Sequence, residues 1–271
     1  PAGIQFAEEV SLTYATEMKR IKRLFQTIVT GQRTIQRGVP DGDTVEFDKW
    51  MASRIDRKLK RQPSEQFYSR TVLNHRDPAV AFLVDLSSST NEITSEAKPI
   101  LDVEKAALLL MSEALHGLGD PFAIYGWSGF GREQVVFYTA KSFDEPWSNQ
   151  TRAKVGGLKW KLENRDGAAI RHVVAKMSSW KHAQKILIIL SDGKPLDSGS
   201  SHYYDAYAQA DTKQALQSAR SAGVTPFCVT IDPYGQDYLV DMYGPNRFMT
   251  IEDLSLFPEK LARLYANLTT N

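Results

Sequence analysis

The stretch Val80-Ala-Phe-Leu-Val-Asp-Leu-Ser-Ser-Ser-Thr-Asn91 determines how this chain folds. Its first five residues are all apolar, a run of the length and character of a strand buried on both faces. The run ends in Asp85, Ser87 and Ser89, a carboxylate followed by two hydroxyls on alternate residues. Ligands of parallel sheets bind beyond the carboxyl ends of the strands, so these side chains lie where chemistry is expected.

Short apolar runs alternate with helical patterns from Ala79 onward. This alternation predicts a doubly wound α/β fold, with a mostly parallel six-stranded sheet and helices on both faces. The expected strands are 80–84, 122–125, 134–138, 186–190, 226–231 and a short 247–250. The expected helices are 99–118, 167–178, 204–221 and 256–268.

A second strand end carries matching chemistry. The run 186–190 is followed by Ser191-Asp-Gly-Lys194, which places Asp192 at a strand end that can be adjacent to Asp85. Carboxylates and hydroxyls are hard oxygen ligands that suit Mg²⁺, and this set leaves octahedral positions for water or an external ligand. The alternative for 85–91 is a serine-rich cap of the next helix, since Asp and Ser favour helix starts and turns. The match between two separate strand ends favours the metal site.

Competing active sites lack residues that they need. The chain has no GxxxxGK[ST] phosphate loop, which disfavours a nucleotide hydrolase of that type. A nucleophile elbow would need glycine at Phe130, and Gln134 stands where the third glycine of GxGxxG belongs. An aspartyl phosphatase would need a second carboxylate at Ser87, and the 5 histidines show no metal-ligand spacing. The site is therefore better suited to binding a carboxylate than to breaking a bond.

Composition and charge narrow the class of protein. The 271 residues are 42% apolar and 24% charged, which fits a globular chain and excludes disordered, collagen-like and disulfide-rich classes. A net charge of +1 supports neither a nucleic-acid nor an anionic-membrane partner. The single cysteine, Cys228, cannot form an internal disulfide, and no run approaches 18 apolar residues. We therefore expect a cytoplasmic protein with no membrane span.

Residues 1–76 are expected to form a helical N-terminal extension before an α/β domain at 77–271. Apolar residues recur at helical spacing over 6–28 and over 47–60. The extension holds 14 Lys and Arg against 9 Asp and Glu, a net charge of +5, which leaves −4 for 77–271. Its basic residues fit either the solvated side of amphipathic helices or a contact surface for an acidic partner.

The two strand ends resemble the metal-ion-dependent adhesion site of von Willebrand factor A (VWA) domains. In that site DxSxS, a threonine on a middle loop and an aspartate after a later strand hold the metal. The positions that match the first motif and the aspartate are Asp85, Ser87, Ser89 and Asp192. Asn164, on the middle loop 163–172, stands where the family usually has threonine, and its amide oxygen can coordinate directly or through water.

The resemblance implies a bound Mg²⁺, with Mn²⁺ and Ca²⁺ as alternatives, that receives an acidic side chain of a client protein. The side chains expected to support the ligands or to contact the client are Asp166, Ser128 and Lys194. The loop 191–207, rich in Ser and Tyr, is expected to border the site and to help select the client.

Further motifs, in the same order along nearly the whole chain, look like the C-terminal part of the CbbO/NorD group. They are Asp41-Gly-Asp43, Arg76-Asp-Pro-Ala-Val80, Asp120-Pro-Phe-Ala-Ile-Tyr-Gly126, Ser191-Asp-Gly-Lys-Pro195, Asp211-Thr-Lys213 and Thr230-Ile-Asp-Pro-Tyr-Gly-Gln-Asp-Tyr-Leu239. This resemblance implies a non-catalytic adaptor that pairs with a hexameric MoxR-type AAA+ ATPase of the CbbQ kind, so that the ATPase can remodel the bound client.

Two clients follow from the two branches of this group. The CbbO branch serves a Rubisco activase, and the NorD branch is linked to nitric oxide reductase maturation. The wording of the middle loop, 164–172, favours Rubisco, and a NorD-type adaptor is the alternative. Two other classes stay open: a magnesium-dependent phosphatase or hydrolase, and an adhesion or structural VWA protein that works without an ATPase.

Overall fold

The computed structural model describes residues 2–31, 33–73, 77–94, 97–191, 195–199, 203–232, 235–251 and 253–269. Their contacts divide the chain into two compact units. Unit 1 comprises Pro1–Phe25 and Asp77–Asn271, and unit 2 comprises Gln26–Arg76. This grouping differs from the expected division into 1–76 and 77–271, because the first 25 residues pack with the α/β body.

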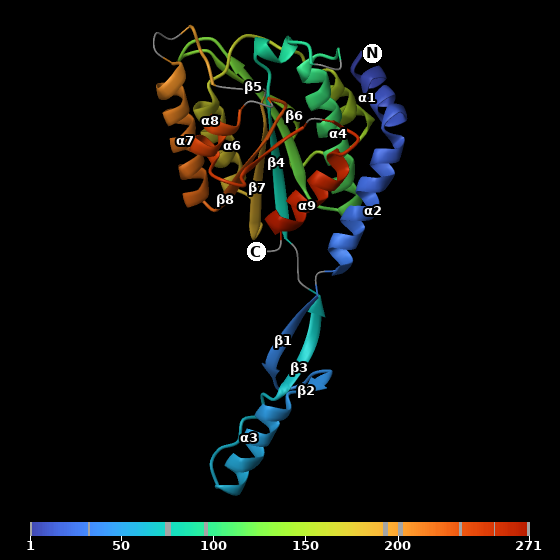
Figure 1. Ribbon diagram of the computed structural model, residues 1–271, viewed down its shortest axis with the longest axis vertical. Helices are drawn as coiled ribbons and strands as arrows, with labels where there is room; N and C mark the ends of the chain where they lie inside the picture. The colour runs from blue at the N-terminus through green and yellow to red at the C-terminus, as the bar shows by residue number, and fades with distance from the viewer. Residues whose placement is uncertain are drawn as a thin grey trace. The chain divides into compact units, whose positions relative to one another are not determined.

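A six-stranded sheet lies at the centre of the described part of unit 1, in the order β6-β5-β4-β7-β8-β9 (Figure 1). Its strands are β4 (Pro78–Asp85), β5 (Phe122–Gly129), β6 (Val135–Lys141), β7 (Gln184–Leu190), β8 (Val224–Thr230) and β9 (Phe248–Thr250). All neighbouring strands are parallel except β5 and β6. The predicted mostly parallel six-stranded sheet is therefore confirmed. Strand order reverses between β4 and β7, which is where such folds bind ligands.

Helices cover both faces of this sheet (Figure 1). On one side lie α6 (Asp166–Ser178), α7 (Asp205–Ser221) and α8 (Gln236–Tyr243), and on the other α4 (Ile100–Leu118), α5 (Asn149–Gly156) and α9 (Phe257–Thr269). All eight residues of β4 are buried, because a strand covered on both faces has no solvent side. Its alternate residues Ala79, Ala81 and Leu83 share one core cluster with side chains of α6, α7 and α8.

The four helices expected between the strands correspond to α4, α6, α7 and α9. Sequence patterns missed α5 and α8, because each has only eight residues and shows too few turns for a helical period. A capping box starts α5, in which Ser148 and Thr151 satisfy each other's backbone N–H groups.

Two N-terminal helices, α1 (Ala2–Thr13) and α2 (Ala15–Gly31), begin the chain. Helix α1 approaches α5 so closely that a Cβ on Gly3 would lie 2.1 Å from the carbonyl oxygen of Ala153. The buried Phe25 of α2 stacks on Tyr265 of α9, with ring centroids 5.1 Å apart. These contacts explain why the first 25 residues belong to unit 1.

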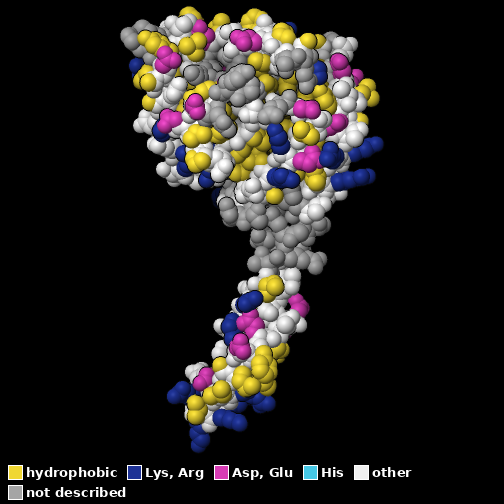
Figure 2. Space-filling model, in the orientation of Figure 1, with side chains coloured by type: hydrophobic (Ala, Val, Ile, Leu, Met, Phe, Trp, Pro, Cys, Tyr) yellow, Lys and Arg dark blue, Asp and Glu magenta, His cyan; other side chains and the backbone are white. Residues whose placement is uncertain are grey.

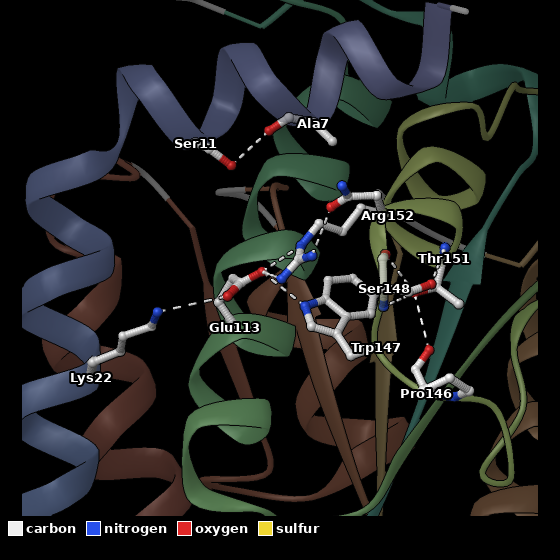
Figure 3. A network of polar contacts seen from close by, with 10 residues as sticks. Ala7, Ser11, Lys22, Glu113, Pro146, Trp147, Ser148, Thr151 and Arg152 are labelled. Atoms are coloured by element: carbon white, nitrogen blue, oxygen red, sulfur yellow. Dashed lines mark hydrogen bonds and ion pairs between the residues drawn. The ribbon is translucent and has the colours of Figure 1, made fainter.

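A polar network centred on Glu113 of α4 joins three helices (Figure 3). One oxygen of its carboxylate accepts hydrogen bonds from Trp147 Nε1 at 2.8 Å and from Arg152 Nε at 2.7 Å. The other oxygen lies 3.8 Å from Lys22 Nζ on α2. Because Arg152 belongs to α5, this one carboxylate links α2, α4 and α5.

The described part of unit 2 contains a small antiparallel sheet, the helix α3 and the last residues of α2. Its described elements are β1 (Arg33–Val39), β2 (Thr44–Val45), α3 (Phe47–Lys58) and β3 (Tyr68–Leu73), with strand order β1-β3-β2. The helix expected at 47–60 is confirmed as α3, and the extension also contains the three strands, which the sequence did not indicate. Strand β1 has no alternation of buried apolar residues that could reveal it, since Ile35 is exposed. Among all described residues, no helix is long and apolar enough to cross a membrane.

Candidate metal centre

The carboxyl ends of β4 and β7 form the base of the predicted site. The two strands are parallel neighbours, with Val84 opposite Leu190 in the register. Asp85 and Ser191 therefore reach the same edge of the sheet, where the Ser191 hydroxyl donates to Asp85 Oδ2 at 3.2 Å. The predicted adjacency of these two strand ends is confirmed. Asp192 lies outside the described residues.

The Asp85 carboxylate is fully buried and held on both oxygens. Its Oδ1 accepts the backbone N–H of Ser87 at 2.8 Å, and its Oδ2 accepts the side-chain amide of Asn164 at 2.7 Å. Burial raises the pKa of Asp85, because an ionised carboxylate loses its hydration in the interior, while these hydrogen bonds act in the opposite direction. The surrounding donors thus fix the orientation of a carboxylate that is costly to bury.

The hydroxyls of Ser87 and Ser89 lie together beside this carboxylate, with their Oγ atoms 2.9 Å apart. Ser87 is buried and Ser89 is exposed, so the pair leads from the interior to the surface. Ser87 precedes the short 3₁₀ helix Ser88–Asn91, yet its side chain makes no capping hydrogen bond. The next α-helix, α4, is preceded by Pro99, which also makes no side-chain cap. Helix capping, the alternative explanation for this motif, therefore does not account for the two hydroxyls.

The spacing of these hydroxyls agrees with magnesium coordination. Adjacent ligands of an octahedron with metal–oxygen distances of 2.0–2.1 Å lie about 2.9 Å apart. Ser87 Oγ and Ser89 Oγ, which hydrogen-bond each other here, have the same separation of 2.9 Å. Among the described side chains, no group of three or more His, Cys, Asp or Glu is placed to hold a metal. The oxygens present at this site are hydroxyl and carboxylate oxygens, a hard donor set that fits Mg²⁺.

Asn164 does not offer an oxygen to the site. Its Oδ1 accepts the backbone N–H of Leu196 at 2.7 Å, which fixes its Nδ2 as the atom that faces Asp85 Oδ2. In this conformation the amide oxygen bonds a backbone donor and the amide nitrogen orients the Asp85 carboxylate. Coordination of a metal by Asn164, directly or through water, stays a prediction.

The middle loop is joined to the loop that follows β7. Asn164 and Leu196 form a second bond through their backbones, from Asn164 N to Leu196 O at 3.1 Å. The neighbouring Glu163 carboxylate accepts both the backbone N–H and the hydroxyl of Ser198. Two successive residues of the middle loop thus hold two residues of the loop after β7 above the site.

A buried ion pair continues this junction. Arg165 Nη1 lies 3.3 Å from Asp197 Oδ2, and the Arg165 guanidinium lies over the Tyr203 ring at 4.0 Å from its centroid. Asp197 Oδ1 accepts the backbone N–H groups of Gly131 at 2.8 Å and of Gly199 at 3.1 Å. Asp197 therefore ties together the middle loop, the turn after β5 and the loop after β7.

The remaining predicted residues occupy different positions. Ser128 is buried, and its hydroxyl donates to Glu163 O at 3.1 Å and accepts from Leu162 N at 3.0 Å. These two bonds hold the backbone at the start of the middle loop against β5. Asp166 is buried in the first turn of α6, where the helix dipole favours a negative charge. Lys194 lies outside the described residues.

Sequence reasoning missed the Arg165–Asp197 pair and the apolar residues that border the site. The pair joins positions 32 residues apart, and no local spacing signals such a contact. The apolar border consists of exposed side chains on three loops, Phe130, Trp160, Leu162 and Leu196. Leu162 adjoins the hydroxyl pair directly, because its carbonyl oxygen accepts the backbone N–H of Ser88 at 2.6 Å. Single exposed apolar residues in loops carry no periodicity by which a sequence could mark them.

Comparison with known proteins agrees with this geometry. The family model for the von Willebrand factor type A domain matches residues 79–261. The chain belongs to the VWA domain family. A solved structure with the same fold is the D319A mutant of the PilB minor pilin from Streptococcus sanguinis, with a TM-score of 0.54 and 13% identity over 73% of this chain and 63% of that one. At that identity the likeness concerns the fold alone.

Curated relatives of this VWA domain extend the similarity beyond the α/β body. Protein NorD of Stutzerimonas stutzeri is 34% identical over 90% of this chain and 40% of its own length. An uncharacterized protein of Pseudomonas aeruginosa is 35% identical over 92% of this chain and 40% of its own length. The chain thus spans about 40% of the length of these relatives.

Proposed function

We propose that this VWA domain is the non-catalytic recognition module of a NorD-type adaptor. In this proposal Asp85, Ser87 and Ser89, together with Asp192, hold Mg²⁺ at the switch point of the sheet, and Asn164 orients Asp85. The bound metal would supply one strong, directional bond to a carboxylate of a client protein. A MoxR-type AAA+ ATPase then remodels the client. The recognition domain spans 77–271, a range that contains the family match, and residues 1–76 precede it as an extension.

One observation carries the proposal: two serine hydroxyls that hydrogen-bond each other lie beside a buried carboxylate and cap no helix, and their separation fits adjacent ligands of Mg²⁺. Their location at the point where strand order reverses is the expected ligand position of this fold. The described site presents no His, Cys or Lys close to these oxygens that would act as base or nucleophile, which favours binding over bond cleavage.

The named relatives favour one client over the other. They are NorD proteins, whereas the sequence interpretation gave preference to Rubisco. We therefore propose nitric oxide reductase, or a protein of its maturation, as the client, and the Rubisco interpretation becomes the outcome that a binding experiment has to exclude.

The surroundings of the site suggest which client segment fits. Phe130, Leu162 and Leu196 border it and have exposed fractions of 46%, 54% and 52%. A groove of about 290 Å³ lies beside it and is lined by Ser128, Gly129, Val136, Tyr138, Trp160, Lys161 and Leu162. A client segment with an acidic side chain flanked by large apolar residues would coordinate the metal and pack against this apolar border.

Metal binding is tested by thermal unfolding with and without Mg²⁺. A metal that binds only the folded state at a hundred times its dissociation constant stabilises it by about 2.7 kcal/mol. We expect this gain in the unmodified chain and its loss in Ser89→Ala, a substitution at an exposed position. Ser88→Ala is the matched control and should keep the gain, since its backbone rather than its hydroxyl bonds Leu162. Equal Mg²⁺ responses in the two variants would contradict the assignment of ligands.

Client recognition is tested by capture of purified nitric oxide reductase and, in parallel, of purified Rubisco on the immobilised chain. The proposal predicts capture of the reductase in Mg²⁺, its loss in EDTA and its loss in Ser89→Ala. Retention of Rubisco alone would replace the NorD-type proposal with the Rubisco interpretation. Capture that survives both EDTA and Ser89→Ala would show that the client does not bind through the metal.

A further inference from the structure

Helix α3 of unit 2 exposes a continuous apolar row. Phe47, Met51, Ile55 and Leu59 follow one another at four-residue intervals, and their exposed fractions are 63%, 41%, 52% and 57%. Each step of four residues turns a helix by only about 40°, so these side chains lie on one face and cover about 18 Å of its length. Figure 2 shows hydrophobic side chains gathered over this part of unit 2, with Lys and Arg side chains nearby. We call these four residues the α3 row.

The α3 row is not the core of unit 2. Of the residues of this unit whose side chains the structure describes, only Val39, Ser53 and Ser69 are buried. Two of the three are serines, so the described side chains of the unit bury almost no apolar surface. A helix packed against its own sheet would turn its apolar face inward. Here the apolar face points to solvent, which is the arrangement of a helix that completes its packing on another surface.

The charged residues next to the α3 row indicate the chemistry of the surface on which this helix would pack. Residues 47–61 contain 6 Lys and Arg against 2 Asp and Glu, a net charge of +4. At helical spacing Arg54 and Lys58 form a row directly beside the apolar one, and Lys60 and Arg61 follow its end. The guanidinium of Arg54 is held over the Trp50 ring, 5.1 Å from its centroid. A partner surface therefore needs carboxylates along the edge that meets Arg54 and Lys58.

A groove extends this surface at the beginning of α3. It has a volume of about 580 Å³. Its lining comprises apolar, basic, acidic and hydroxyl side chains: Ile35, Arg37, Thr44, Glu46, Phe47, Asp48, Lys49, Ser69, Arg70 and Thr71. Within it, Glu46 is already paired with Lys49 at 2.7 Å and with Arg37 at 3.6 Å. The groove thus combines apolar side chains with three basic and two acidic ones, and it is continuous with the α3 row through Phe47.

We propose that unit 2 is a docking module for a second protein, which offers an apolar groove edged by carboxylates to the α3 row. The contact has the form of helix-in-groove recognition, in which residues at one helical face act as anchors. A second copy of this chain does not fit, because two α3 surfaces of charge +4 would repel each other across the interface. The proposal goes beyond the metal-dependent function and does not depend on it.

The experiment places a photo-crosslinking phenylalanine derivative at Met51 of the full chain in the cell that naturally makes it, followed by mapping of the crosslinked peptides. The matched control carries the same group at the exposed Arg57, which points away from the α3 row by helical spacing and does not line the groove. We expect Met51 to crosslink to one protein at an apolar site flanked by Asp or Glu, and Arg57 not to do so. The double substitution R54E/K58E should lower the Met51 crosslink by at least about tenfold, since it sets two new carboxylates against those of the partner and like charges across an interface repel each other.

Each other outcome overturns the proposal. Crosslinks from Met51 to residues 77–269 of the same chain would mean that the α3 row packs internally, and crosslinks to a second copy would mean self-association. A partner site without carboxylates, no crosslink, or a crosslink insensitive to R54E/K58E would also refute it. Ser89→Ala should leave the Met51 crosslink intact while it removes client capture, so failure of the docking module and failure of the metal site are told apart.

Discussion

Asp197 is predicted to hold three loops around the metal centre, and its replacement tests that role. The side chain is fully buried, and its partner Arg165 has only 10% of its side chain exposed. In Asp197→Ala the guanidinium loses its counter-charge, and the backbone N–H groups of Gly131 and Gly199 lose their acceptor. In Asp197→Asn the acceptor Oδ1 remains, and only the charge of the pair is removed.

The expected losses in the free energy of unfolding follow from these contacts. Removing one partner of a buried ion pair costs about 3–5 kcal/mol, because the remaining charge stays buried without compensation. We expect that range for Asp197→Ala. For Asp197→Asn we expect about 1.5–3 kcal/mol, the usual value of a hydrogen bond to a charged group, since the bonds to Gly131 and Gly199 persist. Stacking of Arg165 on Tyr203 favours the lower part of both ranges, because the guanidinium keeps one partner.

Hydrogen exchange at the amide of Gly131 measures this loss directly, because that amide donates to Asp197. A cost of 4 kcal/mol corresponds to exchange about a thousand times faster if the loops open locally. Urea unfolding of the same variants separates local opening from global destabilisation. Asp253→Ala is the control, since this exposed carboxylate bonds the nearby Ser255 and should leave exchange at Gly131 unchanged. An unaltered rate at Gly131 in Asp197→Ala would refute the proposed role.

Two further predictions concern the body of unit 1. A Cβ on Gly167 would lie 2.1 Å from Asp211 Oδ2, so Gly167→Ala should lower the free energy of unfolding by about 1–3 kcal/mol, measured in urea. Gly117→Ala is the control: its Cβ would meet nothing within 4 Å, and it should stabilise α4 by about 0.5–1 kcal/mol. Equal effects of the two substitutions would contradict this explanation. Burial lowers the pKa of Lys141 from 10.5 to about 8. Between these pH values the unfolded chain therefore binds more protons than the folded one, and the free energy of unfolding, relative to that of Lys141→Met, should rise with pH by up to about 3 kcal/mol. A difference between the two proteins that does not change with pH in urea titrations would show that the amine titrates normally.

The sequence predicted the parts of the site that depend on local order. Asp85, Ser87 and Ser89 lie within five residues of one another after a buried strand, so a tight turn is enough to bring their side chains together. The adjacency of β4 and β7 was also predictable, since doubly wound sheets place their ligands where strand order reverses. The orientation of Asn164 was not predictable, because the backbone N–H of Leu196, a residue 32 positions away, decides which of its amide atoms faces Asp85.

The fold of unit 2 shows the same limit of prediction from sequence. The apolar residues at four-residue intervals from Phe47 to Leu59 predicted a helix, and the helix is present. The same pattern normally implies that the apolar face is buried, yet here it is exposed. Strands β1 and β3 escaped prediction, because a sheet whose described side chains are mostly exposed imposes no alternation on its sequence.

By itself, the sequence determined a VWA-type α/β body and a cluster of hard oxygen ligands at the end of its first sheet strand, because apolar runs and short motifs act over a few neighbouring residues. Only the tertiary structure decided that Asn164 orients a carboxylate, that Arg165 and Asp197 join the loops above the site and that the α3 row faces solvent. Those outcomes depend on which distant backbone groups and side chains meet. A contact between residues far apart in the chain leaves no periodic trace along it.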